Sequence, residues 1–370
     1  MNGKDKSEQK KNEDFGHLNR RTALKQIMGL PVLGGLSAGF GASFSLEEGC
    51  LLAQSETGNN EKTATDKVDA VSGATRTSWE MPDTSTLKSK ITKAKIGPLE
   101  VSRLILGGNL IGGWAHSRDL VYVSELIKRY HTKEKVFQTF QIAEQCGINT
   151  FMGNPIMNEM MSEYWRWTDG KMQFISDCGG GGGHTIVENI QIAIDFGCDA
   201  CYIHGGIADR LVADKDFDTI ARCFEVMRDN GLPAGMGGHY QSTVQGIVEE
   251  GLIPDFWMKT FHHTKYWSAQ NPTEHDNIFC REPDETRAFM QERPEPWIAF
   301  KTLGAGAILP AEGFKFAWEG GADFVCVGMY DFQIIDDANI WNEVQNAPSQ
   351  RKRRILETVT ENEEPAAEEA

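Results

Sequence analysis

Residues 184–206 read HTIVENIQIAIDFGCDACYIHGG, and this stretch shows the pattern that decides the fold. Its first part, HTIVENIQIAIDFG, is amphipathic and ends in glycine, the usual residue just past the C-terminus of a helix. The next residues include Ala200–His204, a short β-rich run that ends in a polar side chain. The stretch therefore predicts a helix followed by a strand.

The same alternation of helix and strand continues on both sides of this stretch. Two further amphipathic segments, KEKVFQTFQIAEQCG and DFDTIARCFEVMRDNG, also end in glycine. Eight runs have the composition of strands: Leu104–Gly107, Asn149–Met152, Gln173–Asp177, Ala200–His204, Pro233–Gly237, Phe256–Thr260, Ile298–Thr302 and Phe324–Gly328. Eight strands alternating with helices predict an α/β protein, a closed (β/α)8 TIM barrel over residues 91–348. The segment KIGPLEVSRL before the first strand predicts a hairpin across the bottom of the barrel.

Composition limits the classes of partner. The chain has 370 residues and a formal net charge of −16, which argues against nucleic acid as a partner. The last ten residues, ENEEPAAEEA, are strongly acidic, so we interpret residues 349–370 as a charged C-terminal tail. The eight cysteines include no pair of CxxC motifs, which excludes a zinc ribbon.

The N-terminus has the composition of a targeting segment. Arg20 and Arg21 are followed by Leu24-Lys25 and then by a Gly-rich, mildly apolar run. Residues 1–53 resemble a twin-arginine export signal, and the resemblance implies the twin-arginine translocase as a partner and a periplasmic or other extracytoplasmic location. A membrane anchor is the alternative, but glycines, serines and Pro31 interrupt the run.

Residues 54–90 are polar and predict a disordered linker. Within it, VDAVSGATRTS (residues 68–78) resembles the flavinylation motif of extracytoplasmic flavoproteins. The resemblance implies FMN attached through a phosphoester to Thr75, an FMN transferase that attaches it, and a redox partner protein. A Ser/Thr-rich linker that matches by chance is the alternative.

Three further segments, KIGPLEVSRLILGGN, EQCGINTFMGNPIMNE and DACYIHGG, resemble the aldo-keto reductase superfamily. The catalytic tetrad of that family does not carry over, because Met152, Met157 and Asp177 stand at the positions of its Asp, Tyr and Lys, and only His204 remains. Asp331 and other acids follow the last predicted strand, where family members hold the 2′-phosphate of NADPH. The sequence therefore predicts a barrel that is not an ordinary NADPH-dependent carbonyl reductase.

The ends of the predicted strands supply the candidate catalytic residues, because active sites of such barrels lie at the C-terminal strand ends. These candidates are Asp177, His204, His239, Lys259 and Lys301. The first three are suitable ligands for a divalent metal. In a metal-free alternative, a carboxylate and two imidazoles perform acid–base chemistry while the two lysines hold an anionic group or polarise a carbonyl. Lys259 is also a candidate for a Schiff base.

The loop TLGAGAILP after the seventh predicted strand contains Gly304 and Gly306. Their backbone N–H groups are candidates for binding an anionic cofactor or substrate group, and a plain tight turn is the alternative.

Two enzymatic functions fit these features, and both act on a small-molecule substrate. The first is an exported flavin-linked oxidoreductase that carries FMN at Thr75. The second is an exported lyase, isomerase or hydrolase acting on sugars or small carbonyl compounds, with or without a metal. A binding barrel without catalytic activity is the third alternative.

Overall fold

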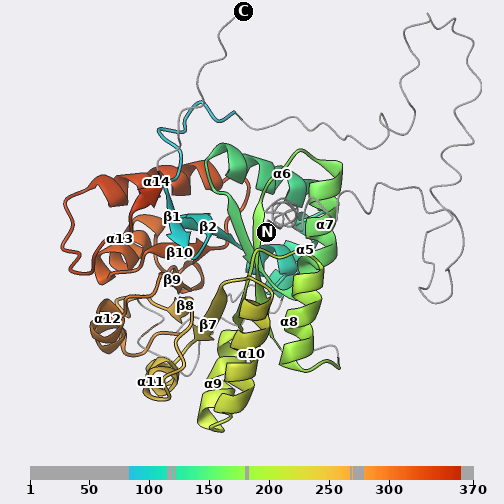
Figure 1. Cartoon of the computed structure of the whole chain (residues 1–370). Helices are drawn as coiled ribbons and strands as arrows, with labels where there is room; N and C mark the ends of the chain where they lie inside the picture. The colour runs from blue at the N-terminus through green and yellow to red at the C-terminus, as the bar shows by residue number, and fades with distance from the viewer. Residues whose placement is uncertain are drawn as a thin grey trace, which may run out of the picture. The chain divides into compact units, whose positions relative to one another are not determined.

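The computed structural model describes residues 83–114, 120, 122–179, 183–266, 269 and 279–359 (Figure 1). The predicted export signal, Thr75 and most of the predicted linker lie outside these residues. The described residues form one compact unit, which belongs to Trp79–Ala370.

The centre of this unit is a closed barrel of eight parallel strands in the order β10-β3-β4-β5-β6-β7-β8-β9. Its strands are β3 (Leu104–Gly107), β4 (Thr150–Gly153), β5 (Gln173–Cys178), β6 (Ala200–Ile203), β7 (Ala234–Gly238), β8 (Phe256–Thr260), β9 (Trp297–Phe300) and β10 (Phe324–Val327). All eight predicted strands are confirmed, and the (β/α)8 fold with them.

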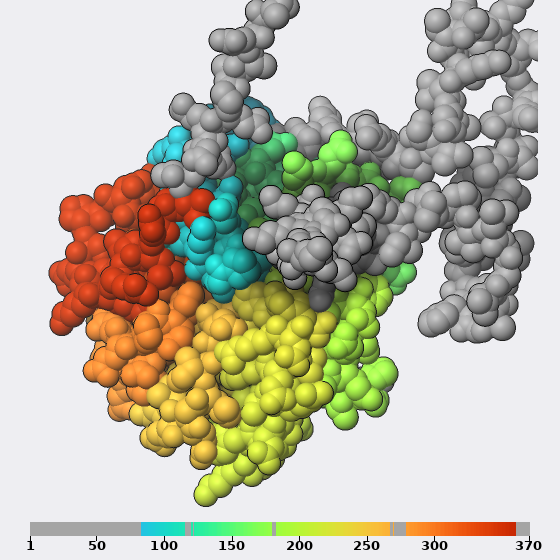
Figure 2. Space-filling view, in the orientation of Figure 1, coloured from blue at the N-terminus to red at the C-terminus, as the bar shows by residue number. Residues whose placement is uncertain are grey.

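Helices cover the outside of the barrel and follow one another around it in chain order (Figures 1 and 2). In chain order, the helices and short 3-10 turns of the described residues are α4 (Asn109–Gly112), α5 (Tyr122–Tyr130), α6 (Lys133–Gln145), η1 (Pro155–Met157), α7 (Asn158–Trp167), α8 (Ile186–Asp195), α9 (Gly205–Ala213), α10 (Phe217–Asp229), α11 (Gln241–Glu249), α12 (Pro283–Gln291), η3 (Gly304–Gly306), α13 (Pro310–Gly320) and α14 (Ile334–Asn346). Thr185 and Glu188 form a capping box that fixes the start of α8. None of the helices in the described ranges has the length and apolar composition needed to cross a bilayer.

The strands alternate between two cores. Ile175 of β5 and Met258 of β8 pack inside the barrel, whereas Phe174 and Trp257 pack in the layer between the barrel and the helices. Successive side chains of a strand point to opposite sides, so the residue two places beyond an inward side chain also faces the interior. This alternation decides which residues at the strand ends reach the mouth of the barrel.

The predicted hairpin is present at the end of the barrel that faces the viewer in Figure 1. It consists of β1 (Lys93–Ile96) and β2 (Leu99–Ser102), and a third strand, β11 (Thr358–Val359), pairs with β1. The boundary placed at residue 349 is therefore wrong, because Arg351 and Arg353 are buried in ion pairs with Asp323 and the following residues join this sheet. The fold continues at least to Val359.

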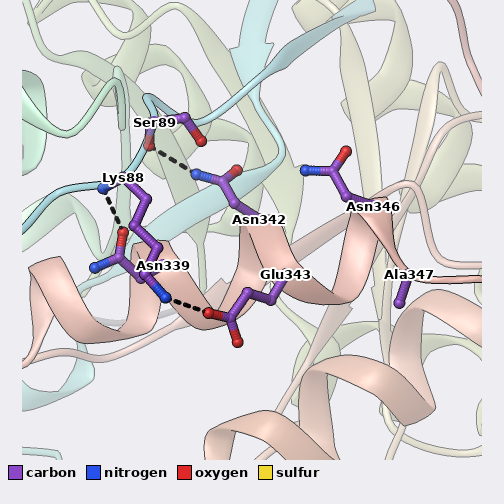
Figure 3. Close-up of a pocket in the computed structure, with 7 residues that line it drawn as sticks. All are labelled: Lys88, Ser89, Asn339, Asn342, Glu343, Asn346 and Ala347. Atoms are coloured by element: carbon purple, nitrogen blue, oxygen red, sulfur yellow. Dashed lines mark hydrogen bonds and ion pairs between the residues drawn. The ribbon is translucent and has the colours of Figure 1, made fainter.

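The boundary placed at residue 90 is also too late. Lys88 donates its backbone N–H to Asn339 at 2.8 Å and its ammonium to Glu343 at 2.5 Å, and Asn342 donates to the carbonyl of Ser89 at 2.7 Å (Figure 3). These residues line a surface pocket of about 350 Å³ beside α14. The chain just before β1 is thus fixed against the last helix, and Figure 2 shows the two ends of the fold, cyan and red, in contact.

Candidate active site at the barrel mouth

A cavity of about 900 Å³ opens at the C-terminal ends of the barrel strands. Its lining includes the predicted Asp177, His204, His239, Lys301 and Gly306. Pockets of this size that combine apolar walls with a few polar groups are typical ligand sites. The structure therefore brings most of the predicted site together in one cavity.

Asp177 reaches this cavity from β5. It lies two residues after the inward-facing Ile175, and its carboxylate accepts a hydrogen bond of 2.9 Å from the side chain of Asn154. Burial raises the pKa of Asp177 to about 7, although the hydrogen bond from Asn154 acts to lower it. Near neutral pH this carboxyl group therefore exists in both protonation states, as acid–base catalysis requires.

The raised pKa of Asp177 predicts a gain in stability when the charge is removed. The folded pKa lies above the unfolded value of 3.8, so the energetic cost of the buried carboxylate is absent at low pH and grows as the pH rises towards about 7. Asp177→Asn should therefore raise the free energy of unfolding at pH 8 by about 2 kcal/mol, and this gain should shrink towards pH 4. Urea unfolding at both pH values measures it.

The matched control for this variant is Asp195→Asn, which neutralises an exposed carboxyl group at the end of α8. It should give no gain that depends on pH in this way. An Asp177→Asn variant that is less stable than wild type at pH 8 would show that the ionised carboxylate supports the fold.

His239 follows β7 and forms a pair with Asp209 on α9. The His239 Nδ1 lies 2.7 Å from Asp209 Oδ2, and Asp209 also accepts hydrogen bonds from the backbone N–H of His239 and the hydroxyl of Thr243. Burial acts to raise the pKa of Asp209, but these hydrogen bonds outweigh it and lower the pKa below its usual value. An ionised Asp209 holds the proton on Nδ1, so Nε2 is the ring nitrogen that is left to accept a proton from a ligand.

His204 lies between Asp177 and His239, because β5, β6 and β7 are neighbours in the barrel. Its ring is 6.2 Å from that of His239, and its Nδ1 accepts a hydrogen bond from the backbone N–H of Gly206 at the start of α9. Burial, His239 and Lys301 lower the pKa of His204 to about 4. His204 is therefore neutral at pH 7, and its Nε2–H is a hydrogen-bond donor.

The structure places only one of the two predicted lysines, Lys301, at the cavity. Lys259 is buried and does not line the cavity: its ammonium donates to the carbonyl oxygens of His239 and Thr260 and to the Thr260 hydroxyl, at 2.8, 3.1 and 3.0 Å. The preceding Met258 faces the barrel interior, so Lys259 faces outward. The structure therefore does not bring Lys259 to the cavity with the other predicted residues, although burial lowers its pKa to about 8.

Lys301 does line the cavity, although it follows the strand β9 and is not part of it. Its backbone has a φ of +57°, a left-handed conformation that is uncommon outside glycine and turns the chain at this point. Its ammonium lies 3.8 Å from the centre of the Phe279 ring. Arg281 brings a second cationic side chain to the same cavity.

The loop that contains Gly304 and Gly306 does not leave their backbone N–H groups open for an anion, as the sequence had suggested. Gly304 and Gly306 have φ values of +51° and +82°, so the turn requires their conformational freedom. Their N–H groups donate to the carbonyls of Lys301 and Leu303 within the turn. These N–H groups are therefore already paired within the loop, which favours the interpretation of the two glycines as a tight turn over the interpretation as an anion site.

The predicted metal ligands do not form a metal-binding group. Across the ranges that the structure describes, no set of three His, Cys, Asp or Glu side chains is arranged to hold a metal ion. Asp177 bonds to Asn154, His239 bonds to Asp209, and His204 accepts from a backbone N–H. Each side chain is therefore oriented by a partner of its own.

The residues after β10 do not fit the 2′-phosphate of NADPH. Asp331 accepts hydrogen bonds from Tyr130 and Lys135, and Asp336 and Asp337 lie in the first turn of α14. Burial and the neighbouring Asp336 raise the pKa of Asp337 to about 7. The acidic side chains at this end of α14 would repel a phosphate, so no catalytic step through this cofactor follows from the site.

The sequence did not reveal several of the residues that complete the cavity. Asn154 and Asp209 stand on the segments after β4 and β6, and each orients a predicted catalytic side chain. Tyr202 is two residues before His204 and lines the cavity from inside the barrel. The inward alternation along β6 was the available signal for Tyr202.

Comparisons with known proteins agree with the fold. No protein-family model and no curated protein sequence matches the chain. Among solved structures, that of a protein from Pseudomonas aeruginosa described as an aldo-keto reductase is similar to this one. The two chains share 14% identity with a TM-score of 0.51, and the similarity covers 71% of this chain and 99% of that chain.

Two other similar structures have lower TM-scores. An aldo-keto reductase from a Medee basin deep-sea metagenome library has 11% identity and a TM-score of 0.44, covering 72% of this chain and 97% of its own. A truncated 3-deoxy-D-arabino-heptulosonate 7-phosphate synthase from Thermotoga maritima has 9% identity and a TM-score of 0.44, covering 70% and 93%. The similarity to the Pseudomonas aeruginosa structure, at 14% identity, supports the (β/α)8 fold alone.

Proposed function

We propose that this protein is an exported enzyme that transfers protons at a carbon next to a carbonyl group, as a lyase or isomerase of sugars or small carbonyl compounds. The observation that carries this proposal is the His239–Asp209 pair in a cavity that also contains Asp177 and His204. The twin arginines and the run that follows them support export.

Each side chain has a chemical role that its surroundings support. His239 Nε2 accepts the proton from the substrate carbon, because Asp209 holds the other ring nitrogen protonated. The neutral His204 donates its Nε2–H to the carbonyl oxygen and stabilises the charge that develops there. Asp177 in its protonated form returns a proton on the other side of His204. Lys301 attracts an anionic substrate group.

The proposal is tested by proton exchange with solvent. Dihydroxyacetone, glyceraldehyde and fructose are incubated with the protein in D2O, and deuterium incorporation next to the carbonyl is followed by NMR. Exchange that depends on the protein and is lost in His239→Gln supports the proposal. Exchange with none of the three compounds above the rate without protein contradicts it.

A second candidate function, flavin-linked oxidoreduction, is supported by the motif VDAVSGATRTS. In this alternative, an FMN transferase attaches FMN to Thr75 after export, and the flavin exchanges electrons with a redox partner protein. Thr75 lies outside the described residues, so the motif carries this candidate by itself.

The flavin candidate predicts a covalent modification. Wild-type protein produced together with an extracytoplasmic FMN transferase should gain the mass of FMN minus water and turn yellow, because the Thr75 hydroxyl forms the phosphoester. Intact-mass spectrometry measures this gain. Thr75→Ala should lose both the added mass and the colour.

Replacing Arg20 and Arg21 together by Lys should keep the protein in the cytoplasm and unmodified, and an exported double variant would contradict the signal assignment.

A further inference from the structure

Exposed aromatic side chains gather around the mouth of the barrel. Among the described residues, five large aromatic side chains are exposed: Trp114, Tyr122, Phe196, Tyr240 and Phe332. All but Phe196 follow the C-terminal ends of barrel strands, and Phe196 follows α8 at the opposite end. Exposed apolar surface concentrated on one face of a protein is typical of a binding site.

Two of these rings, those of Trp114 and Tyr240, lie on opposite sides of the cavity. Trp114 follows β3 and Tyr240 follows β7, and these two strands are four places apart in the closed order of eight. Both side chains line the cavity, and both are exposed, by 42% and 59%. A ligand that contacts both must therefore pass across the mouth, over the catalytic side chains.

On the β10 side the aromatic surface is held rigid. Phe332 stacks on Tyr330 with ring centres 5.2 Å apart and planes at 6°, and Tyr330 stacks on His131 at 5.4 Å and 12°. Between them in sequence, Asp331 is fixed by Lys135 through a 2.9 Å ion pair. Phe332 is nevertheless 67% exposed, so this column of stacked rings offers a flat apolar face beside the cavity, which Tyr330 lines.

The cavity carries positive charge in an acidic protein. Among its described lining residues, the cations Lys301 and Arg281 outnumber the one carboxyl group, Asp177, whereas the whole chain has a net charge of −16. The overall negative charge disfavours an anionic ligand elsewhere on the protein, so the two cations at the cavity favour the binding of a negative group there.

We propose that the barrel mouth binds an oligosaccharide of acidic sugars, with one uronic acid ring in the cavity and neighbouring rings packed on the exposed aromatic side chains. The apolar faces of sugar rings pack on aromatic rings, and the hydroxyl groups at the ring edges bond to polar side chains such as Asn109, Asn154 and Gln333. The carboxylate of the central ring pairs with Lys301 and Arg281.

This substrate class rests on the proposed function for its reaction. In a uronic acid ring, C5 carries a hydrogen next to the carboxyl group. A base removes that proton, the bond from C4 to the glycosidic oxygen breaks, a double bond forms between C4 and C5, and an acid returns a proton to the departing oxygen. This elimination needs no oxidant or reductant, and His239 and Asp177 supply the base and the acid.

Binding is measured by isothermal titration calorimetry with tetragalacturonate and with the neutral maltotetraose. Wild-type protein should bind tetragalacturonate at least about tenfold more tightly than maltotetraose. Trp114→Ala and Tyr240→Ala should each weaken binding of tetragalacturonate about tenfold. Phe196→Ala, which removes the exposed aromatic ring at the other end of the barrel, should bind like wild type.

Binding of the oligosaccharide and the elimination reaction are tested separately. Elimination adds a conjugated double bond, which absorbs ultraviolet light. If tetragalacturonate binds as expected and no such absorbance develops, the substrate class stands and the elimination is contradicted. Absence of binding, tighter binding of maltotetraose, or unchanged binding in both Trp114→Ala and Tyr240→Ala overturns the inference, even if proton exchange with small carbonyl compounds is observed.

Discussion

The Asp209→Asn variant is expected to lose turnover by a factor of about 10² to 10⁴ in the solvent-exchange assay, because His239, the proposed base, loses the carboxylate that orients its ring. The carboxylate of Asp209 accepts the proton on His239 Nδ1 at 2.7 Å. An asparagine in its place offers an N–H group that favours the opposite tautomer, in which Nε2 carries the proton. His239 would then face the substrate as a donor and could not remove a proton.

The matched control is Thr243→Val, which removes another hydrogen bond to Asp209, of 2.6 Å, and leaves the His239–Asp209 pair in place. This variant should keep most of the activity. In Asp209→Asn the loss should appear in kcat more than in KM, since Asp209 does not line the cavity among the described residues. Equal rates in wild type and Asp209→Asn would show that His239 is not the base.

The barrel was predictable because its signals are local. Each strand is a short β-rich run, and a glycine after a helix, such as Gly197 or Gly231, has the positive φ that the helix end requires. The C-terminal boundary was not predictable in this way. Arg351 and Arg353 have the composition of a solvated tail, and their buried partner Asp323 lies about 30 residues earlier in the sequence.

The candidate site was predictable in part. Positions at the strand ends identify Asp177, His204, His239 and Lys301, and the inward alternation of β8 would have excluded Lys259. The partners of these residues were not predictable, because they depend on how helices pack against strands. Asp209 is one acid among many on the helix surfaces of the sequence, and only the packing of α9 beside β7 places it against His239.

The largest expected effect on stability is at the bottom of the barrel. Asp323 is fully buried, and its carboxylate accepts from Arg351 at 2.9 Å, from Arg353, and from the backbone N–H of Trp297 at 3.0 Å. Asp323→Asn removes the charge that both buried guanidinium groups face. Breaking a buried ion pair from one side costs about 3–5 kcal/mol, because the remaining charge stays buried without compensation.

That loss is a large part of the total stability of a domain, about 5–15 kcal/mol, and chemical denaturation should measure it as a lower midpoint. The matched control is Glu343→Gln, which breaks an ion pair with Lys88 at the surface, where the side chains are 61% and 65% exposed. Water screens that pair, so its removal should cost less than about 1 kcal/mol. If the two variants lose equal stability, the buried ion pairs of Asp323 contribute no more to the free energy of unfolding than an exposed pair does, and they only position the end of the chain.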